Sequence, residues 1–434
     1  MKQHFRTNPA FANLQPSSTL YVNETVNQLW QQGETVFHMG FGESRFNVHP
    51  KLQDALQKHA DKKSYLPAKG LPQLTSAVAE YYSAKLKQNY QQSQVIIGPG
   101  SKSLIYGLQM ILDADVFLPT PSWVSYAPQA RLLHNRYKYI PSKVEDNYQL
   151  DIDELDVLVQ NSGNPCKLLV INSPNNPTGE VWSEQFLNEL ADYCRRNKIL
   201  VLSDEIYFQV VYGDQQHVSI SQFYPEGTFV LGGLSKHLSI GGWRVGVALL
   251  PNTDLGKELM KKLVIFSSET WSGVSAPIQY AAVLAYQEDS EIEQYISDCA
   301  SIHGIRTHYI RDELTKLGIR CTGGHGAFYL TANFDRFTQG LSAQGVKTSI
   351  ELSRYLLDRF NIATLPGVDF GIPEETLSLR LSTSYLDMEK EDDSDRLYQL
   401  FLSNMDEQEF MSETHHPNTH AALMFYKKCI AALS

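Results

Sequence analysis

The sequence predicts an α/β protein with a mainly parallel sheet in a large domain, followed by a smaller α+β domain. Two observations predict this class. Short runs rich in β-branched residues alternate with helical patterns, and turn residues bound each run. Such alternation is typical of parallel strands that are buried on both faces. The chain also has 434 residues, which exceeds one small core and indicates two or three domains.

The first elements are an N-terminal arm and the strands of the large domain. The arm, 1–45, is polar, contains Pro9 and Pro16, leads into one helix over 21–32, and is expected to pack with the small domain. The large domain, 46–290, is predicted to hold strands at 94–97, 115–118, 167–171, 199–202, 228–231 and 245–250. Helical patterns lie between them, as at 183–197, where four apolar residues share one face.

The small domain, 291–434, is predicted to open with a long helix over 291–317. Strands follow at 327–331 and 377–382, with a helix over 350–360 between them. The last segment begins acidic and polar at residue 406 and ends in a helical pattern over 422–433.

Composition excludes several classes of function. With 37 basic and 48 acidic residues, a net charge of −11 and no dense Lys/Arg cluster, nucleic acid is not an expected partner. No apolar run reaches the ~18 residues of a membrane span, and the start lacks the apolar core of a secretory signal. Five scattered cysteines without a Cys-x-x-Cys pair fit a reducing compartment, so we expect a cytoplasmic protein.

No metal site is expected. Three histidines gather near the C-terminus, at His415, His416 and His420. Pro417 is expected to interrupt any helix that would align them, and no carboxylate partner is evident.

Chemistry-bearing residues follow the predicted strands in a fixed order. They comprise the segment 173–179 (SPNNPTG), Asp204 to Tyr207 (DEIY), Ser235-Lys236, and the segment 242–246 (GWRVG). Each piece alone is ordinary: a surface lysine, a Pro/Gly turn, a helix-capping aspartate. Together they lie at the carboxyl ends of strands, where open α/β sheets place ligands.

The order and spacing of Asn176, Asp204, Lys236 and Arg244 resemble the class I/II aminotransferases over residues 42–382. The resemblance implies the fold of fold-type I enzymes that use pyridoxal 5′-phosphate (PLP), with a mainly parallel seven-stranded sheet. It implies that Lys236 forms the Schiff base with PLP and that Asp204 pairs with the pyridine nitrogen, a cationic partner that a buried carboxylate requires. Asn176 and Tyr207 would hydrogen-bond the ring hydroxyl oxygen.

The phosphate of PLP needs its own cradle. The segment 98–102 (GPGSK) follows a predicted strand and opens a helix over 104–112, whose N-terminus suits an anion. By resemblance, Ser101 and Lys102 bind the phosphate through their backbone N–H groups, Ser101 also through its hydroxyl, and Arg244 adds a bidentate charge. Family members often carry a hydroxyl where this chain has Gly233. Either Ser235 substitutes in part, or the phosphate has one contact fewer.

Further residues follow from the same resemblance. Trp123 would stack on the pyridine ring, and Tyr65 would reach the phosphate of a neighbouring subunit, which implies a homodimer with shared sites. Arg380 would clamp the substrate α-carboxylate. Gly42 would leave room for substrate opposite that arginine, and Asn176 would also contact substrate.

The amino-acid side chain that the site accepts is less determined. Trp271 lies near the position where dicarboxylate-specific members place an arginine, which argues against a dedicated aspartate enzyme and favours a larger or less acidic side chain. His325 is a candidate for contact with substrate, although a loop histidine without a role is the more common case.

The expected activity is transfer of an α-amino group between an amino acid and a 2-oxo acid. Two alternatives stay open at this level. The same fold also supports PLP-dependent lyases, cyclases and oxidases, because Asp204 and Lys236 generate the same carbanion in each. A ligand-sensing domain fused to a DNA-binding region would need a basic winged-helix segment ahead of residue 42, for which the arm has no room.

Overall fold

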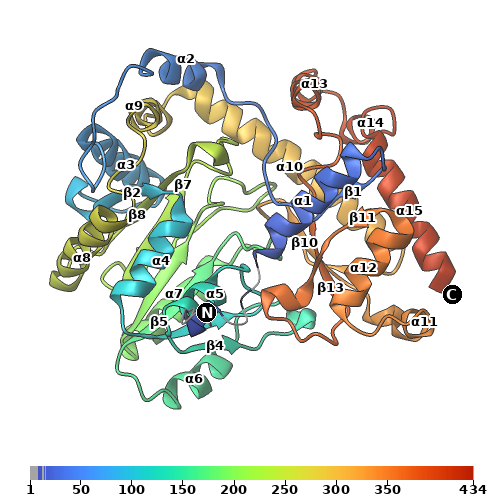
Figure 1. Cartoon of the computed structure of the whole chain (residues 1–434), viewed down its shortest axis with the longest axis horizontal. Coiled ribbons are helices and arrows are strands. Elements are labelled where there is room, and N and C mark those ends of the chain that lie inside the picture. Colours follow the sequence, from blue (N-terminus) through green and yellow to red (C-terminus); the bar gives the residue numbers. More distant parts are fainter. Residues whose placement is uncertain (1–7, 12–13, 15, 434) are drawn as a thin grey trace, which may run out of the picture.

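The large sheet of the computed structural model has seven strands, and the described residues are 8–11, 14 and 16–433. Its strand order is β2-β8-β7-β6-β5-β3-β4, and only β8 runs antiparallel to its neighbours (Figure 1). The strands are β2 (Val95–Pro99), β3 (Asp115–Pro119), β4 (Tyr137–Ile140), β5 (Lys167–Asn172), β6 (Ile199–Asp204), β7 (Thr228–Gly233) and β8 (Val245–Leu249). The mainly parallel sheet predicted from the alternating pattern is confirmed.

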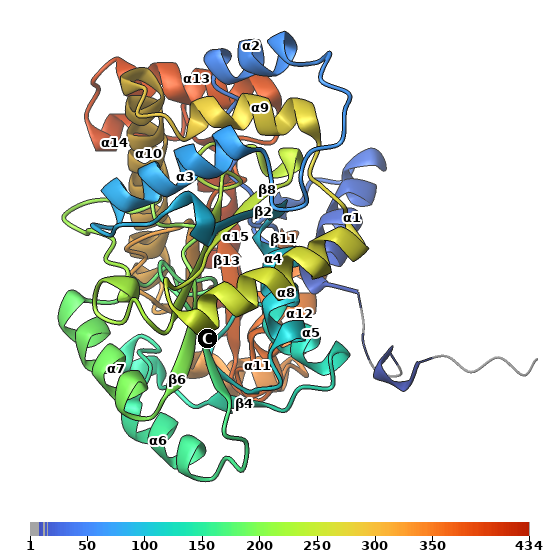
Figure 2. The same cartoon turned by 90° about the vertical axis from the view of Figure 1, so that its left-hand side faces the viewer.

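Helices cover both faces of this sheet because successive strand residues point to opposite sides. In β3, Val116 and Leu118 join one apolar cluster and Phe117 joins another. Figure 2 shows α4 and α5 on one side of the sheet and α6 and α7 on the other. The helices are α2 (Pro50–Lys58), α3 (Pro72–Lys85), α4 (Ser101–Ile111), α5 (Tyr126–Leu132), α6 (Ile152–Gln160), α7 (Glu184–Arg196), α8 (Asp254–Thr270) and α9 (Ala276–Ala285).

The second half of the chain builds an antiparallel sheet, in the order β12-β13-β10-β9. It follows the long helix α10 (Ser290–Lys316), and α12 and α15 pack in its core with Leu330, Leu379 and Leu381. The strands are β9 (Arg320–Cys321), β10 (Tyr329–Asn333), β11 (Ile362–Ala363), β12 (Leu365–Pro366) and β13 (Ser378–Ser382). The helices are α11 (Thr338–Ala343), α12 (Ser349–Phe360), α13 (Glu391–Leu402), α14 (Glu407–Phe410) and α15 (Pro417–Leu433).

The N-terminal segment lies against this second region. Helix α1 (Ser18–Gln31) is followed by β1 (Phe37–His38), which pairs in parallel with β11 (Figure 1). Phe37 and Met39 enter the same apolar cluster as β10 and β13. Of the predicted arm, residues 1–7, 12, 13 and 15 lie outside the described residues. The domain boundaries at 46–290 and 291–434 stay predictions.

Two local predictions were wrong for physical reasons. Strand β4 was missed because it lies at the sheet edge, and in its YKYI sequence only Ile140 is fully buried. Pro417 begins α15 and does not interrupt a helix, since proline is accepted in a first turn. The carboxylate of Asp387 accepts hydrogen bonds from the backbone N–H groups of Asn418 (2.6 Å) and Thr419 (3.0 Å). Asp387 thus caps the N-terminus of α15. Because Asp387 is distant in the sequence, the local sequence does not reveal this cap.

Across the described part of the chain, none of the helices combines the length and apolarity needed to cross a bilayer. Within the same residues, no group of three or more His, Cys, Asp and Glu side chains is arranged to hold a metal ion.

Candidate active site

Three of the predicted site residues gather at one edge of the large sheet. Asp204 is the last residue of β6, Asn176 follows β5 in the next loop, and Lys236 follows β7. Because these three strands are parallel neighbours, their carboxyl ends meet at the same edge. The order of strands thus brings together residues that are 28 and 32 positions apart in the sequence.

Asn172, which the sequence analysis missed, joins two of these residues. It is the last residue of β5 and pairs in register with Asp204. Its side-chain amide donates to the carbonyl of Asp204 (2.7 Å), and its Oδ1 accepts from the backbone N–H of Asn176 (2.8 Å). Asn176 is buried, and its own Oδ1 has no hydrogen-bond partner among the described residues. A strand-terminal asparagine beside a Pro/Gly loop was the available signal.

The carboxyl group of Asp204 is buried at the base of the site. Tyr126 donates a hydrogen bond to its Oδ2 (2.7 Å), and the backbone N–H of Ile206 lies 3.3 Å from Oδ1. Burial raises the pKa of Asp204 to about 6, although these two hydrogen bonds and the charge of Lys236 act in the opposite direction. A cationic partner would stabilise the charged form of this buried carboxyl group, because it offsets the free-energy cost of removing the charge from water.

Lys236 extends from the sheet edge toward the N-terminal segment. Its Nζ donates to the carbonyl of Gly42 (2.8 Å) and lies 5.5 Å from the ring centroid of Tyr207. The hydroxyl of Tyr207 is 2.8 Å from that of Tyr329 in β10. Burial raises the pKa of Tyr207 well above its ordinary value, so its hydroxyl keeps its proton. The site is therefore lined by both regions of the fold.

The predicted phosphate loop lies beside the same edge. Gly100, at φ +83°, directly precedes α4, so the free N–H groups of the first helical turn begin at Ser101. The guanidinium of Arg244 lies just before this turn: its Nη1 donates to the carbonyl of Gly241 (2.9 Å) and its Nη2 is 3.4 Å from that of Pro99, the last residue of β2. A free helix N-terminus beside a guanidinium suits an anion.

The absence of a hydroxyl at Gly233 has a steric cause. A Cβ atom on Gly233 would lie 2.6 Å from the backbone oxygen of Val245, and one on Gly246 would lie 2.2 Å from the backbone of Gly100 and Ser101. Strands β7 and β8 and the loop before α4 therefore pack too closely for a side chain. Ser235 is partly buried on the following turn.

Lys102 and Trp123 lie together near this loop. The Nζ of Lys102 is 5.0 Å from the ring centroid of Trp123, and Trp123 meets Tyr126 edge to face at 5.3 Å. Partial burial and the charges of Arg244 and Lys236 lower the pKa of Lys102. Lys102 therefore belongs to the same electrostatic environment as Arg244 and Lys236.

Arg380 lies on the opposite side of the site, in β13. Its side chain is buried, its Nη2 donates to the carbonyl of Gly40, and its guanidinium carbon is 4.9 Å from the ring of Tyr329. Its Nε has no hydrogen-bond partner among the described residues. A Cβ on Gly42 would lie 2.0 Å from the hydroxyl of Tyr329, so a side chain there would collide. A buried guanidinium with an unused donor can bind a carboxylate.

Three residues of the sequence analysis lie away from this cluster. The side chain of Tyr65 is 95% exposed. Trp271 is partly buried and packs edge to face on Phe266 at 5.3 Å, against a core cluster of the large sheet. His325 contacts Glu180.

Comparison with known proteins identifies the family. The family model for aminotransferase class I and II matches residues 34–392. The chain belongs to this family. It is therefore an aminotransferase, which moves an α-amino group between an amino acid and a 2-oxo acid, and the sequence-based prediction of family and activity is confirmed.

The aminotransferases to which the chain is similar include enzymes named for aspartate. It is 33% identical to an aspartate aminotransferase of Bacillus subtilis over 378 residues, covering 85% of this chain and 92% of that one. It is 32% identical to the aspartate aminotransferase of Geobacillus stearothermophilus over 380 residues, which cover 86% of this chain and 92% of that one. The structure of Thermus thermophilus aspartate aminotransferase with maleate has a TM-score of 0.80 and 25% identity, covering 92% and 100%. These likenesses confirm the predicted fold class.

Proposed function

We propose that this aminotransferase uses PLP, held by the residues at the edge of the large sheet. The observation that carries the proposal is that a buried carboxyl group, Asp204, and the amine of Lys236 lie at the same edge of the large sheet. The charge of Lys236 lowers the pKa of Asp204 against the effect of burial. The Oδ1 of Asn176 has no hydrogen-bond partner among the described residues. These groups fit PLP, since a pyridinium nitrogen would supply the cation that the Asp204 carboxyl group requires.

When bound, PLP supplies an electrophilic carbonyl and a cationic ring that accepts the electrons left at the substrate Cα. Lys236 would bind that carbonyl covalently through Nζ and, once free, would hold and move the proton taken from the substrate Cα. Asp204 would hold a proton on the ring nitrogen, and Tyr126 and Ile206 orient its carboxylate. Asn176 and Tyr207 would hydrogen-bond the ring hydroxyl oxygen.

The phosphate would bind at the start of α4. Ser101 and Lys102 would donate their backbone N–H groups, Ser101 and Ser235 would offer hydroxyls, and Arg244 would supply a guanidinium. Support comes from the position of Arg244 beside Pro99, two residues before the helix begins. Trp123, which meets Tyr126 edge to face, would stack on the pyridine ring.

The amino-acid substrate would lie between PLP and Arg380. The guanidinium of Arg380 would bind the α-carboxylate and orient the Cα–H bond, while Gly42 leaves space near Tyr329. We propose a dicarboxylic amino acid of the aspartate type, as the names of several relatives suggest. The ammonium of Lys102 would meet the second carboxylate. Trp271 does not argue against this substrate, because its partly buried ring packs edge to face on Phe266.

We also propose a homodimer and a cytoplasmic location. Tyr65 supports the dimer, because an aromatic side chain that is 95% exposed in one chain is available to the site of a second copy. The five cysteines are free thiols in the structure, as a reducing compartment requires.

The test is amino transfer by the purified protein loaded with PLP. With aspartate and 2-oxoglutarate, we expect oxaloacetate to form, and we expect Lys236→Ala to lower kcat by at least ~10³-fold because it removes the Nζ that would bind the cofactor and move the proton. Lys257→Ala, at an exposed lysine of α8, is the matched control and should retain activity. Wild-type turnover by Lys236→Ala would refute the assignment. Turnover of aromatic donors only, with none of aspartate, would refute the substrate class.

A further inference from the structure

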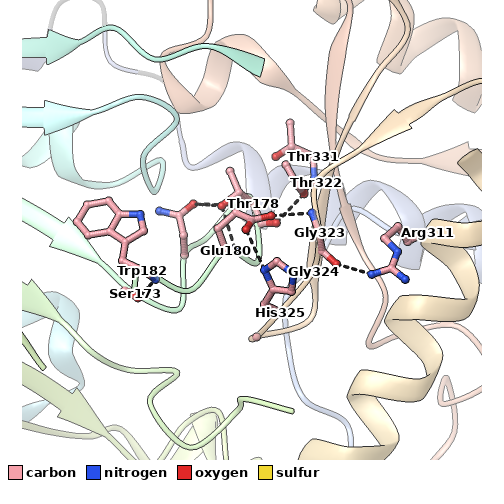
Figure 3. Close-up of polar contacts among 12 residues, drawn as sticks. Ser173, Thr178, Glu180, Trp182, Arg311, Thr322, Gly323, Gly324, His325 and Thr331 are labelled. Atoms are coloured by element: carbon pink, nitrogen blue, oxygen red, sulfur yellow. Dashed lines mark hydrogen bonds and ion pairs between the residues drawn. The ribbon is translucent and has the colours of Figure 1, made fainter. Parts of the chain in front are cut away.

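Two loops meet beside the active site, one from each region of the fold. The first, 173–180, follows β5 and carries Asn176. The second, 322–326, precedes β10, which begins at Tyr329. Figure 3 shows their polar contacts, with Glu180 and His325 facing each other and Arg311 of α10 on the far side.

Glu180 contacts the second loop with both carboxylate oxygens. Its Oε1 accepts from the backbone N–H of Gly323 (2.6 Å), and its Oε2 lies 3.0 Å from Nδ1 of His325 (Figure 3). The Glu180 side chain is 13% exposed and that of His325 is 38% exposed. The carboxylate is therefore mostly enclosed, and the imidazole of His325 is its side-chain partner.

Backbone contacts show how closely the loops fit. The N–H groups of His325 and Gly326 both donate to the carbonyl of Gly179, at 2.9 Å each. Thr322 donates its hydroxyl to the carbonyl of Thr178 (2.6 Å). Gly179 has φ +71°, and a Cβ there would lie 2.4 Å from the backbone oxygen of Tyr329, so the approach requires glycine.

The first loop also fixes the position of Asn176. The backbone N–H of Asn175 donates to the carbonyl of Glu180 (2.9 Å), which closes the turn that holds Asn176. On the other side, Ala327, at φ +57°, leads from His325 to Phe328 and Tyr329. The ring of Phe328 lies 5.7 Å from the Nζ of Lys236, and the hydroxyl of Tyr329 lies 2.8 Å from that of Tyr207.

We propose that Glu180 and His325 are a positioning pair that holds the Asn176 loop and the Phe328–Tyr329 segment in register across the active site. The pair acts through these two loops and does not touch the reacting atoms. The proposal rests on the function proposed above, because Asn176, Tyr207 and Lys236 define the site whose geometry the pair maintains.

The charges around His325 predict how pH acts on the pair. His325 faces Glu180 of the first loop and, from α10, Arg311 and His308. Arg311 donates to the carbonyl of Gly323 (2.7 Å), and the Nε2 of His308 lies 3.0 Å from that of Gly324. The hydrogen bond to Glu180 raises the pKa of His325, against burial and the charge of Arg311. The ion pair is therefore complete below pH 6.5 and is lost as pH rises through this raised pKa.

The test compares Glu180→Gln, His325→Gln and the double variant in the full-length protein loaded with PLP. We expect each single variant to lower kcat/KM for the amino donor about tenfold, and the double variant to lose little more. Without substrate, backbone amides of 322–326 should exchange hydrogen faster in both single variants, and so should those of 174–180. Glu189→Gln, at an exposed position of α7, removes the same charge and is the matched control.

A second measurement addresses the pair directly. The NMR titration of His325 in wild-type protein should give a pKa above 6.5, which Glu180→Gln lowers, and this readout needs no activity. Unchanged exchange and unchanged kcat/KM in Glu180→Gln would overturn the proposal, as would additive effects in the double variant. If Glu180→Gln fails to fold, His325→Gln and the wild-type titration decide in the same way. Failure of the proposed function is separate, since it would appear as activity retained by Lys236→Ala.

Discussion

The two sides of the active site are built in different ways. On the sheet side, Asn176, Asp204 and Lys236 follow the ends of neighbouring parallel strands, and backbone hydrogen bonds of the sheet fix their spacing. On the opposite side, Arg380 meets the carbonyl of Gly40, which is 340 residues away in sequence, and Tyr329 meets that of Gly42, which is 287 residues away. The hydrogen bonding of the sheet fixes the residues on one side. The residues on the other side depend on how the N-terminal segment packs against the second region.

This difference separates two tasks. A sheet edge whose strands are buried on both faces holds its side chains rigidly, which suits a cofactor that stays in place. Contacts between separate segments change with small movements of those segments, which suits a side that admits and releases substrate. We therefore expect substitutions on the sheet side to change cofactor binding, and substitutions on the Arg380 side to change KM for the amino donor.

Of the substitutions that compare the two sides, Asp204→Asn has the largest expected effect. Replacing the carboxylate removes the charge that would stabilise a protonated ring nitrogen, so kcat should fall by roughly 10²–10³-fold and PLP should bind more weakly. Activity assays and absorbance titration with PLP measure the two quantities. Wild-type PLP affinity together with wild-type kcat would show that the sheet edge does not hold the cofactor.

The same variant should stabilise the protein without cofactor. The pKa of Asp204 is about 6 in the folded chain and 3.8 as its ordinary value, so the unfolded state releases this proton first as pH rises. The carboxyl group therefore costs stability above pH 4, and the cost grows until about pH 6, reaching the order of 2–3 kcal/mol. Asparagine avoids this cost. Thermal unfolding of both cofactor-free proteins at pH 4 and pH 7.5 should show a gain for Asp204→Asn only at pH 7.5.

Arg380→Lys should have the next largest effect, and on the other side of the comparison. Lysine keeps the charge but loses the planar fork that binds a carboxylate with two hydrogen bonds. We expect kcat/KM for the amino donor to fall by about 10²-fold, mostly through KM, while the affinity for PLP stays within about twofold. Steady-state kinetics and PLP titration separate these quantities. Arg354→Lys, at an exposed arginine of α12, is the control.

The contrast between the two sides also explains what the sequence could predict. The strands before Asn176 and Asp204 are short apolar runs followed by polar residues, so local pattern and spacing located the sheet edge. Asn172 and Tyr126 were missed because each acts by a hydrogen bond to a residue on another element. The contacts of Tyr329 with Tyr207 and Gly42 could not be predicted for the same reason, since they depend on the packing of both regions. Arg380 and Gly42 were found through resemblance to the family, not through local pattern.

Tyr126→Phe should have the smallest effect of the three and gives the finest test of the sheet side. The hydroxyl of Tyr126 donates to Asp204 at 2.7 Å and thereby lowers the pKa of that carboxyl group. Without it, the pKa of Asp204 rises, so the acid limb of the kcat/KM profile should move to higher pH and activity at pH 7 should fall about fivefold. Tyr286→Phe removes another buried hydroxyl, one that has no partner among the described residues, and should leave the acid limb in place. If both variants shift the limb equally, the shift reflects a general loosening of the core. If only Tyr126→Phe shifts the acid limb, the hydrogen bond from Tyr126 controls the protonation of Asp204.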